Sequence, residues 1–236
     1  MYPDASQHIS TSMIAVGRLF DLSRTRADKW METLKWPWDI LPMIHQIILE
    51  LGPDLSKNEF EHAGEKIWIA RDCKIADTAS LTGPLIIDHE SEIRHCAFIR
   101  GSALIGKNTV VGNSTELKNC ILFDSVQVPH YNYVGDSVLG YKSHMGAGAI
   151  TSNVKGNHSL VTCRVGAQII ETQLKKFGAL LGDYAEVGCN SVLNPGSILG
   201  RNCQVYPLAM VRGFVPENSI FKQQNDIVIR QGPITD

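Results

Sequence analysis

Residues 69–123 read IARDCKIADTASLTGPLIIDHESEIRHCAFIRGSALIGKNTVVGNSTELKNCILF. An aliphatic or aromatic anchor returns at every sixth position of this stretch without a miss: Ile69, Ile75, Leu81, Ile87, Ile93, Ile99, Ile105, Val111, Leu117 and Phe123. A small residue follows most anchors four positions later, and glycine often follows directly, as at Gly106 and Gly112. The same register returns over residues 133–145 and 181–211. If roughly 40% of positions are apolar, ten successive anchors would arise by chance about once in ten thousand trials.

A period of six fits neither a helix of 3.6 residues per turn nor a plain alternating strand. It fits a short strand plus a turn that repeats as one side of a solenoid. Sequences with this hexapeptide signature resemble the left-handed parallel β-helix, in which three hexads make one triangular coil. We therefore predict a mainly β protein whose residues 66–215 form a left-handed parallel β-helix.

The flanking residues do not follow the hexad. Residues 1–65 carry helix-forming residues with apolar positions three and four apart, punctuated by Pro37, Pro42 and Gly52-Pro53. We predict an N-terminal α-helical segment over 1–65 that caps the open end of the solenoid, since a bare terminal coil would expose unpaired strand edges. The tail, residues 216–236, is expected to pack against a neighbour or along a face.

Composition excludes several classes of protein. A net charge of −2 and a sequence pI near 6.4 argue against nucleic acid or an anionic membrane as the main partner. No signal peptide and no run of about 18 apolar residues is present, so we expect a cytoplasmic protein. The six cysteines contain no Cys-x-x-Cys pair, which favours reduced thiols over a zinc or redox site.

The hexad breaks at two places, where sites tend to lie. One break is Pro129-His-Tyr-Asn, and the other is an inserted loop near 154–178 with four basic residues and a single acidic one, Glu171. A basic loop on a near-neutral body indicates an anionic ligand nearby, and a solvated loop is the alternative.

The motifs at the first break are His130-Tyr-Asn-Tyr-Val-Gly-Asp-Ser-Val-Leu-Gly and Met145-Gly-Ala-Gly-Ala-Ile-Thr-Ser-Asn. Over roughly residues 100–215 the chain resembles the acetyltransferase domain of the bifunctional glucosamine-1-phosphate acetyltransferase/N-acetylglucosamine-1-phosphate uridyltransferases. The stretch that begins Thr172-Gln-Leu-Lys-Lys-Phe, together with Asn194-Pro-Gly, is closer still to the archaeal-type branch. The resemblance implies an acetyl-CoA-dependent enzyme that assembles as a homotrimer.

It also implies roles for individual residues. His130 falls on the catalytic histidine, and Ala147 and Cys189 fall on positions that line the acetyl-CoA arm. The substrate-binding positions fall on Arg100, Lys118, Tyr133, Asn153 and, with a loop insertion of about 17 residues, Lys176.

The chemistry suits these residue types. Attack on a thioester needs a neutral amine, so a base with a pKa near 7 must take its proton, and His130 is the candidate. Arg100 can grip a sugar 1-phosphate bidentately, while Lys118 and Lys176 add charge. We expect acetyl transfer to require no metal. Glu116, two residues before Lys118, is expected to pair with it.

Two departures from the family stand out. His144 replaces a second sugar-contacting asparagine, either as a ligand group or as a wall residue, so the hexosamine specificity is open. Residues 1–65 hold no glycine-rich uridyltransferase run, although Trp38-Asp-Ile-Leu resembles the end of that domain. We therefore expect no nucleotidyl transfer, because 236 residues suit the acetyltransferase half alone.

The prediction is an N-acetyltransferase acting on glucosamine 1-phosphate or galactosamine 1-phosphate in nucleotide-sugar biosynthesis. One alternative is a non-catalytic sugar-nucleotide-binding or regulatory trimer that accompanies a separate nucleotidyltransferase. Another is a γ-type carbonic anhydrase, which needs three histidines in metal-binding register, and the expected His-x4-His spacing does not occur.

Overall fold

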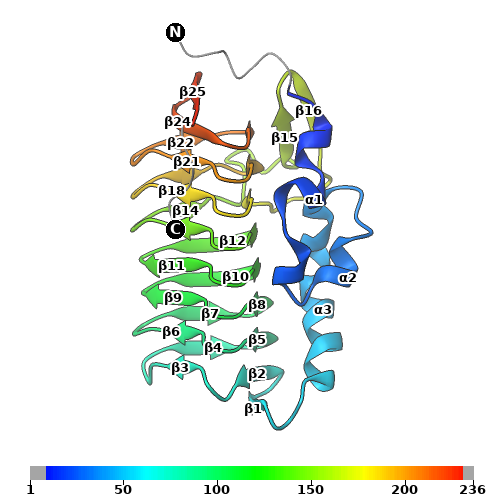
Figure 1. Ribbon diagram of the computed structural model, residues 1–236, viewed down its shortest axis with the longest axis vertical. Coiled ribbons are helices and arrows are strands. Elements are labelled where there is room, and N and C mark those ends of the chain that lie inside the picture. Colours follow the sequence, from blue (N-terminus) through cyan, green and yellow to red (C-terminus); the bar gives the residue numbers. More distant parts are fainter. Residues whose placement is uncertain (1–8, 231–236) are drawn as a thin grey trace.

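The computed structural model describes residues 9–230, and its hexads wind into a three-sided stack of parallel strands (Figure 1). Each strand pairs in register with the equivalent positions of the coils before and after it. Ile69 pairs with Ile87, and Ile87 pairs with Ile105. These three anchors are at most 5% exposed, so the six-residue period does mark the side chains that fill the core. The predicted β-helix fold is confirmed.

The stack has three faces. The first face is a nine-stranded sheet of β3 (Lys74–Ile75), β6 (Glu92–Ile93), β9 (Val110–Asn113), β11 (Gln127–His130), β13 (His144–Met145), β18 (Glu186–Val187), β21 (Gln204–Val205), β24 (Ser219–Gln223) and β25 (Asp226–Ile229). The second face holds β4 (Ser80–Thr82), β7 (Phe98–Arg100), the starts of β10 (Glu116–Leu122) and β12 (Tyr133–Leu139), β14 (Ile150–Thr151), β19 (Val192–Leu193) and β22 (Met210–Val211). The third face holds β1 (Phe60–Gly64), β2 (Ile67–Ala70), β5 (Leu85–Ile87), β8 (Ala103–Ile105), the ends of β10 and β12, β17 (Ala179–Leu181), β20 (Ser197–Leu199) and β23 (Phe214–Val215). Because β10 and β12 continue through a corner, the second and third faces form one fourteen-stranded sheet.

The third face is covered on its outer side by the N-terminal segment. Every residue of β5, β8, β17 and β20 is buried, as expected for parallel strands that are covered on both sides. The covering helices are η1 (Thr11–Ile14), α1 (Val16–Leu19), η2 (Leu22–Arg24), α2 (Asp28–Met31), η3 (Pro37–Met43), α3 (Ile44–Leu51) and η4 (Gly52–Asp54). In α3 the buried residues Ile44, Ile47 and Ile48 form the stripe that packs on β8 and β10.

The placement of these helices differs from the predicted cap. They run along the side of the stack (Figure 1) because the third face carries outward apolar residues, such as Ile86 and Leu104, that need cover. Polar contacts fasten the segment to two coils that are far apart in the stack. Arg26 pairs with the buried Asp88 at 2.5 Å, and the Asp21 backbone N–H donates to Asp183 Oδ2 at 2.7 Å.

Antiparallel strands close both ends of the stack. At one end β1 pairs antiparallel with β2, and at the other β25 pairs antiparallel with β24. The parallel coils therefore run from Ile67 to Gln223, past the predicted limit at residue 215, and the helices end at Asp54 rather than at residue 65. The predicted segments 1–8 and 231–236 lie outside the described residues.

The inserted segment is more ordered than the loop expected from its sequence. It contains a two-stranded hairpin, β15 (Thr162–Val165) and β16 (Gln168–Glu171). Buried Cys163 and Val165 alternate with outward side chains, and this face of β15 lies against β20 and β23.

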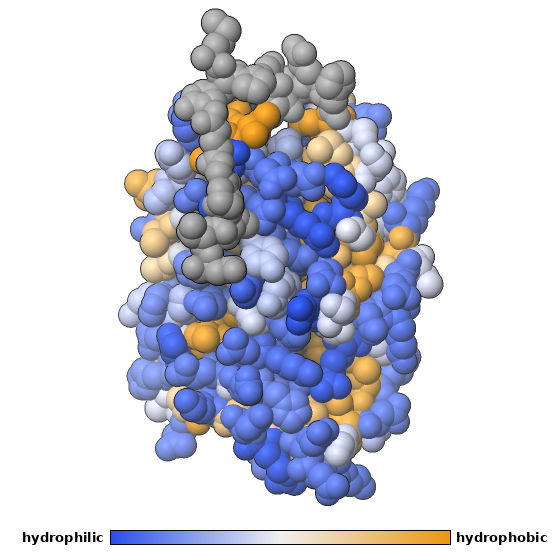
Figure 2. Space-filling view, viewed as in Figure 1, coloured by the Kyte–Doolittle hydropathy of each residue, from blue (hydrophilic) through white to orange (hydrophobic). Residues whose placement is uncertain are grey.

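The described surface in the view of Figure 2 is mainly hydrophilic, with scattered apolar patches.

Candidate active site

Three of the predicted substrate residues lie where the strands of the second face end, and the side chain of a fourth, Tyr133, extends to them. Arg100 is the last residue of β7, and strand register places Lys118 of β10 beside it. Tyr133 begins β12 on the next coil, and Asn153 follows β14 on the coil after that. Strand stacking thus brings together residues that are more than fifty positions apart in the chain.

A buried carboxylate, Asp136, connects this group. It lies at the corner inside β12, is 5% exposed and accepts hydrogen bonds from three side chains. Its Oδ1 accepts from Asn119 Nδ2 at 2.9 Å, and its Oδ2 accepts from Lys118 Nζ at 3.3 Å and from Asn153 Nδ2 at 2.5 Å. Asn153 Nδ2 also donates to the Tyr133 hydroxyl at 3.2 Å. The sequence interpretation missed Asp136, although an aspartate inside an otherwise apolar strand was a visible signal.

Glu116 pairs with a different cation from the one expected. Arg100 Nε donates to Glu116 Oε1 at 2.6 Å, whereas Lys118 pairs with Asp136. The expectation of a Glu116–Lys118 pair was therefore wrong. Residues on neighbouring coils are closer to each other than residues two positions apart on the same strand. The hydrogen bond to Glu116, followed by its charge, raises the pKa of the Arg100 guanidinium.

His130 lies at the preceding corner, between the first and second faces. It is the exposed last residue of β11, and only two residues separate it from Tyr133. Asn132, which is 2% exposed, fixes this corner. Its Nδ2 donates to the carbonyls of Gly146 and Ala149 at 2.8 and 3.0 Å, while its Oδ1 accepts from the His130 backbone N–H at 3.1 Å.

The two predicted co-substrate positions stack in one column with His130. The Gly148 backbone N–H donates to the His130 carbonyl, and strand register continued from Gln127 and His144 places Ala147 beside His130. The same extrapolation from Met145 and Val187 places Cys189 beside Ala147. Successive coils are about 4.8 Å apart, so these three positions line about 10 Å of the corner.

His144 lies on the first face, in β13, and is half-buried. It is therefore separated by a corner from the Tyr133–Asn153 contact. Burial lowers its pKa, Glu186 opposes that shift, and the charge of nearby His130 adds to it. The lowered pKa favours the neutral imidazole of His144 beside His130.

A backbone hydrogen bond of the following residue, Phe177, places Lys176 beside the other predicted substrate residues. The Phe177 N–H donates to the Asn153 carbonyl at 3.0 Å, which places the exposed Lys176 next to Asn153. Phe177 is fully buried against Trp38 of η3, with ring centroids 5.8 Å apart. The N-terminal segment therefore holds the end of the inserted segment at the candidate site.

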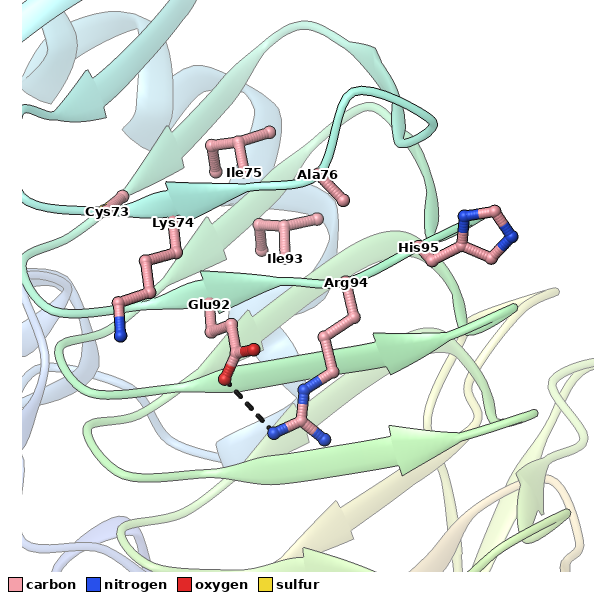
Figure 3. A pocket seen from close by; sticks show the side chains of 8 residues that line it. All are labelled: Cys73, Lys74, Ile75, Ala76, Glu92, Ile93, Arg94 and His95. Atoms are coloured by element: carbon pink, nitrogen blue, oxygen red, sulfur yellow. Dashed lines mark hydrogen bonds and ion pairs between the residues drawn. The ribbon is translucent and has the colours of Figure 1, made fainter.

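A separate open groove of about 670 Å³ lies on the first face over β3 and β6 (Figure 3). Lys74, Glu92, Arg94 and His95 line it, and Arg94 pairs with Glu92 at 3.1 Å. None of the predicted site residues lines this groove.

Metal ligands and membrane spans were also sought in residues 9–230. No group of three or more His, Cys, Asp or Glu side chains there is arranged to hold a metal ion. No helix in that range is long and apolar enough to cross a membrane. All six cysteines are free, and burial raises the pKa of Cys120, Cys163 and Cys203 to about 12.

Comparison with curated proteins finds relatives whose names describe them as bifunctional. The "Bifunctional protein GlmU" of Methanococcus vannielii is 28% identical over 213 residues, which cover 83% of this chain and 47% of the relative. A "Bifunctional sugar-1-phosphate nucleotidylyltransferase/acetyltransferase" of Sulfurisphaera tokodaii is 27% identical over 166 residues, which cover 63% of this chain and 41% of the relative. The chain spans about half the length of the curated relatives it matches.

Among solved structures, the UDP-N-acetylglucosamine acyltransferase of Francisella novicida aligns with a TM-score of 0.36 and 13% identity, covering 64% of this chain and 65% of that one. The predicted resemblance to the archaeal-type enzymes is confirmed by the methanogen relatives. A family model described as the GMPPB C-terminal domain matches residues 81–216, more than half of the chain. The chain therefore belongs to the family of the GMPPB C-terminal domain.

Proposed function

We propose that this chain is an acetyl-CoA-dependent N-acetyltransferase that acts on a hexosamine 1-phosphate. The observation that supports it most is the grouping of Arg100, Lys118, Tyr133 and Asn153 on adjacent coils, one corner away from His130. The names of the curated relatives, which include sugar-1-phosphate acetyltransferase activity, support the same class of reaction.

In this proposal His130 is the general base. Its exposed imidazole takes a proton from the sugar amine as the amine nitrogen attacks the thioester carbonyl. The carbon–sulfur bond then breaks, and the proton held by His130 is returned to the leaving thiolate. Neutral His144 supports this role, because a second imidazolium beside His130 would oppose its protonation.

The sugar phosphate is assigned to the cations of the cluster. A phosphate that carries nearly two negative charges competes with Glu116 for Arg100, whose side chain is 45% exposed. Lys118, which shares Asp136 with Asn153, and Lys176, which lies next to Asn153, add point charges. Tyr133 and Asn153 then bind hydroxyl or amide groups of the sugar ring.

The proposal is tested by replacing His130 with alanine and following thiol release from acetyl-CoA with glucosamine 1-phosphate and galactosamine 1-phosphate as acceptors. Loss of a general base lowers kcat by about 10²–10⁴-fold. His95 is the matched control, since it is also exposed and lies two coils away in the His130 column. Full turnover by H130A, or an equal loss in H95A, contradicts the assignment. Calorimetric titration with acetyl-CoA separates the enzyme from a regulatory sugar-nucleotide-binding trimer, which has no need of the thioester.

A further inference from the structure

A second cavity, distinct from the candidate active site, lies between the inserted hairpin and the last coils. Its volume is about 500 Å³, and Arg164 of β15 and Arg212, which follows β22, both line it. Gln224 and Asn225, in the turn between β24 and β25, add amide groups, and Phe214 and Phe221 form part of its wall.

Glycine fixes the two arginines close together. Gly213 has a φ of +77°, and a Cβ there would lie 2.8 Å from the Arg164 carbonyl oxygen and 3.1 Å from its Cβ. The coil corner therefore contacts β15 directly, and Arg212 is the residue before that corner. Gly196 makes a similar approach to Thr162, so the hairpin is held on two successive coils.

The charges at this cavity are not balanced by carboxylates. Seven of the ten arginines of the chain form ion pairs with Asp or Glu, namely Arg18, Arg24, Arg26, Arg71, Arg94, Arg100 and Arg201. Arg164 and Arg212 pair with no carboxylate of residues 9–230, and no described acidic residue lines the cavity. Two guanidinium groups that line one cavity repel each other, and an anion bound between them would remove that repulsion.

We propose that this cavity binds a phosphate ester or diphosphate. Guanidinium groups bind phosphate oxygens bidentately, and the amides of Gln224 and Asn225 supply further donors. The cavity lies beyond the sugar-phosphate cations along the stack. Strand registers place Arg212 four coils beyond Lys118, which is roughly 19 Å at about 4.8 Å per coil. Lys176 lies closer, because its neighbour Asn153 is about two coils from Arg212.

The test is calorimetric titration of the full chain with pyrophosphate at fixed ionic strength. R164Q and R212Q are each expected to weaken the pyrophosphate Kd at least tenfold, because each removes a bidentate contact. R71Q is the control, since Arg71 is exposed and lies at the opposite end of the stack. No binding to the unaltered chain, or equal weakening in R71Q, overturns the proposal.

A second measurement identifies the source of the phosphate and depends on the proposed acetyltransferase activity. If the site takes the nucleotide end of acetyl-CoA, R164Q raises the KM for acetyl-CoA about as much as it weakens pyrophosphate binding. If it takes a separate phosphorylated ligand, that KM is unchanged while pyrophosphate binding is still lost. The pyrophosphate titration stands by itself even if no transfer is detected.

Discussion

Asp136 illustrates how a single residue can organise the candidate site. Three side-chain donors converge on its two carboxylate oxygens, and two of them belong to Lys118 and Asn153, which we assign to the substrate. Its φ of +49° at the corner is one that Asp and Asn adopt more readily than most residues. Asp136 is thus a positioning residue rather than a substrate ligand.

We expect D136N to preserve the backbone of the corner but to lose the carboxylate that accepts the three hydrogen bonds. An amide NH₂ in place of one oxygen would face other donors, and leaving a buried polar group unsatisfied costs about 1–3 kcal/mol. Urea unfolding should show a loss of that size, with a higher KM for the sugar phosphate. The exposed Asp77 provides the comparison, and D77N should change neither quantity. Unchanged stability and KM in D136N would refute the role.

At the scale of elements, the junction between the N-terminal segment and the coils depends on Asp183. Its carboxylate accepts from the backbone N–H groups of Asp21 and Tyr141 at 2.7 and 2.9 Å and pairs with Arg201 at 3.1 Å. Burial raises the pKa of Asp183 to about 6, although Arg201 and the two N–H donors act in the opposite direction.

This raised pKa predicts a pH dependence of stability. The folded chain holds the Asp183 proton more tightly than the unfolded chain, in which the pKa is close to the ordinary 3.8. The stabilisation that comes from this tighter proton binding is therefore complete below about pH 4 and is lost as pH rises to about 6. The free energy of unfolding falls over this window by at most about 1.4 kcal/mol per pH unit. Unfolding free energies of the unaltered chain and D183N should converge or cross over this window. A difference that stays constant from pH 4 to 7 would exclude the effect.

At the scale of the whole molecule, apolar side chains remain uncovered on the second face and its corner with the first. Tyr131 is 63% exposed, Leu208 is 79% exposed and Met210 is 54% exposed. Strand registers place Tyr131 and Leu208 in one column, three coils apart, and Met210 lies beside Leu208. Large apolar side chains exposed along one side of a protein are typical of an interface between chains. This surface supports the proposed homotrimer, whose subunits would meet near His130.

Sedimentation equilibrium provides the test. The trimer should have three times the 26.0 kDa mass of one chain, and L208D should dissociate it by placing a charge in the interface. I169D is the control, because Ile169 is 58% exposed but lies on the inserted hairpin. A monomeric unaltered chain at micromolar concentration would rule out this assembly.

The sequence predicted the coils well because their determinants are local and periodic. The position of the N-terminal helices on the third face was predicted less well, although the apolar triplets Leu85–Ile87 and Ala103–Ile105 indicated a face that is buried on both sides. Their middle residues lie off the hexad anchors and point outward, towards the helices. Side-chain pairing was hardest to predict, since the partner of Glu116 depends on how neighbouring coils stack. The roles of His130 and the substrate residues remain predictions.

The side-mounted helices have a mechanical consequence. An array of repeats that touch only their neighbours can fray one repeat at a time. Here the N-terminal segment bridges two coils, because it binds Asp88 on an early coil and Asp183 on a late coil. Separating these two coils strains the short stretch of residues 21–26 that joins them, so we expect the coils between Asp88 and Asp183 to unfold together.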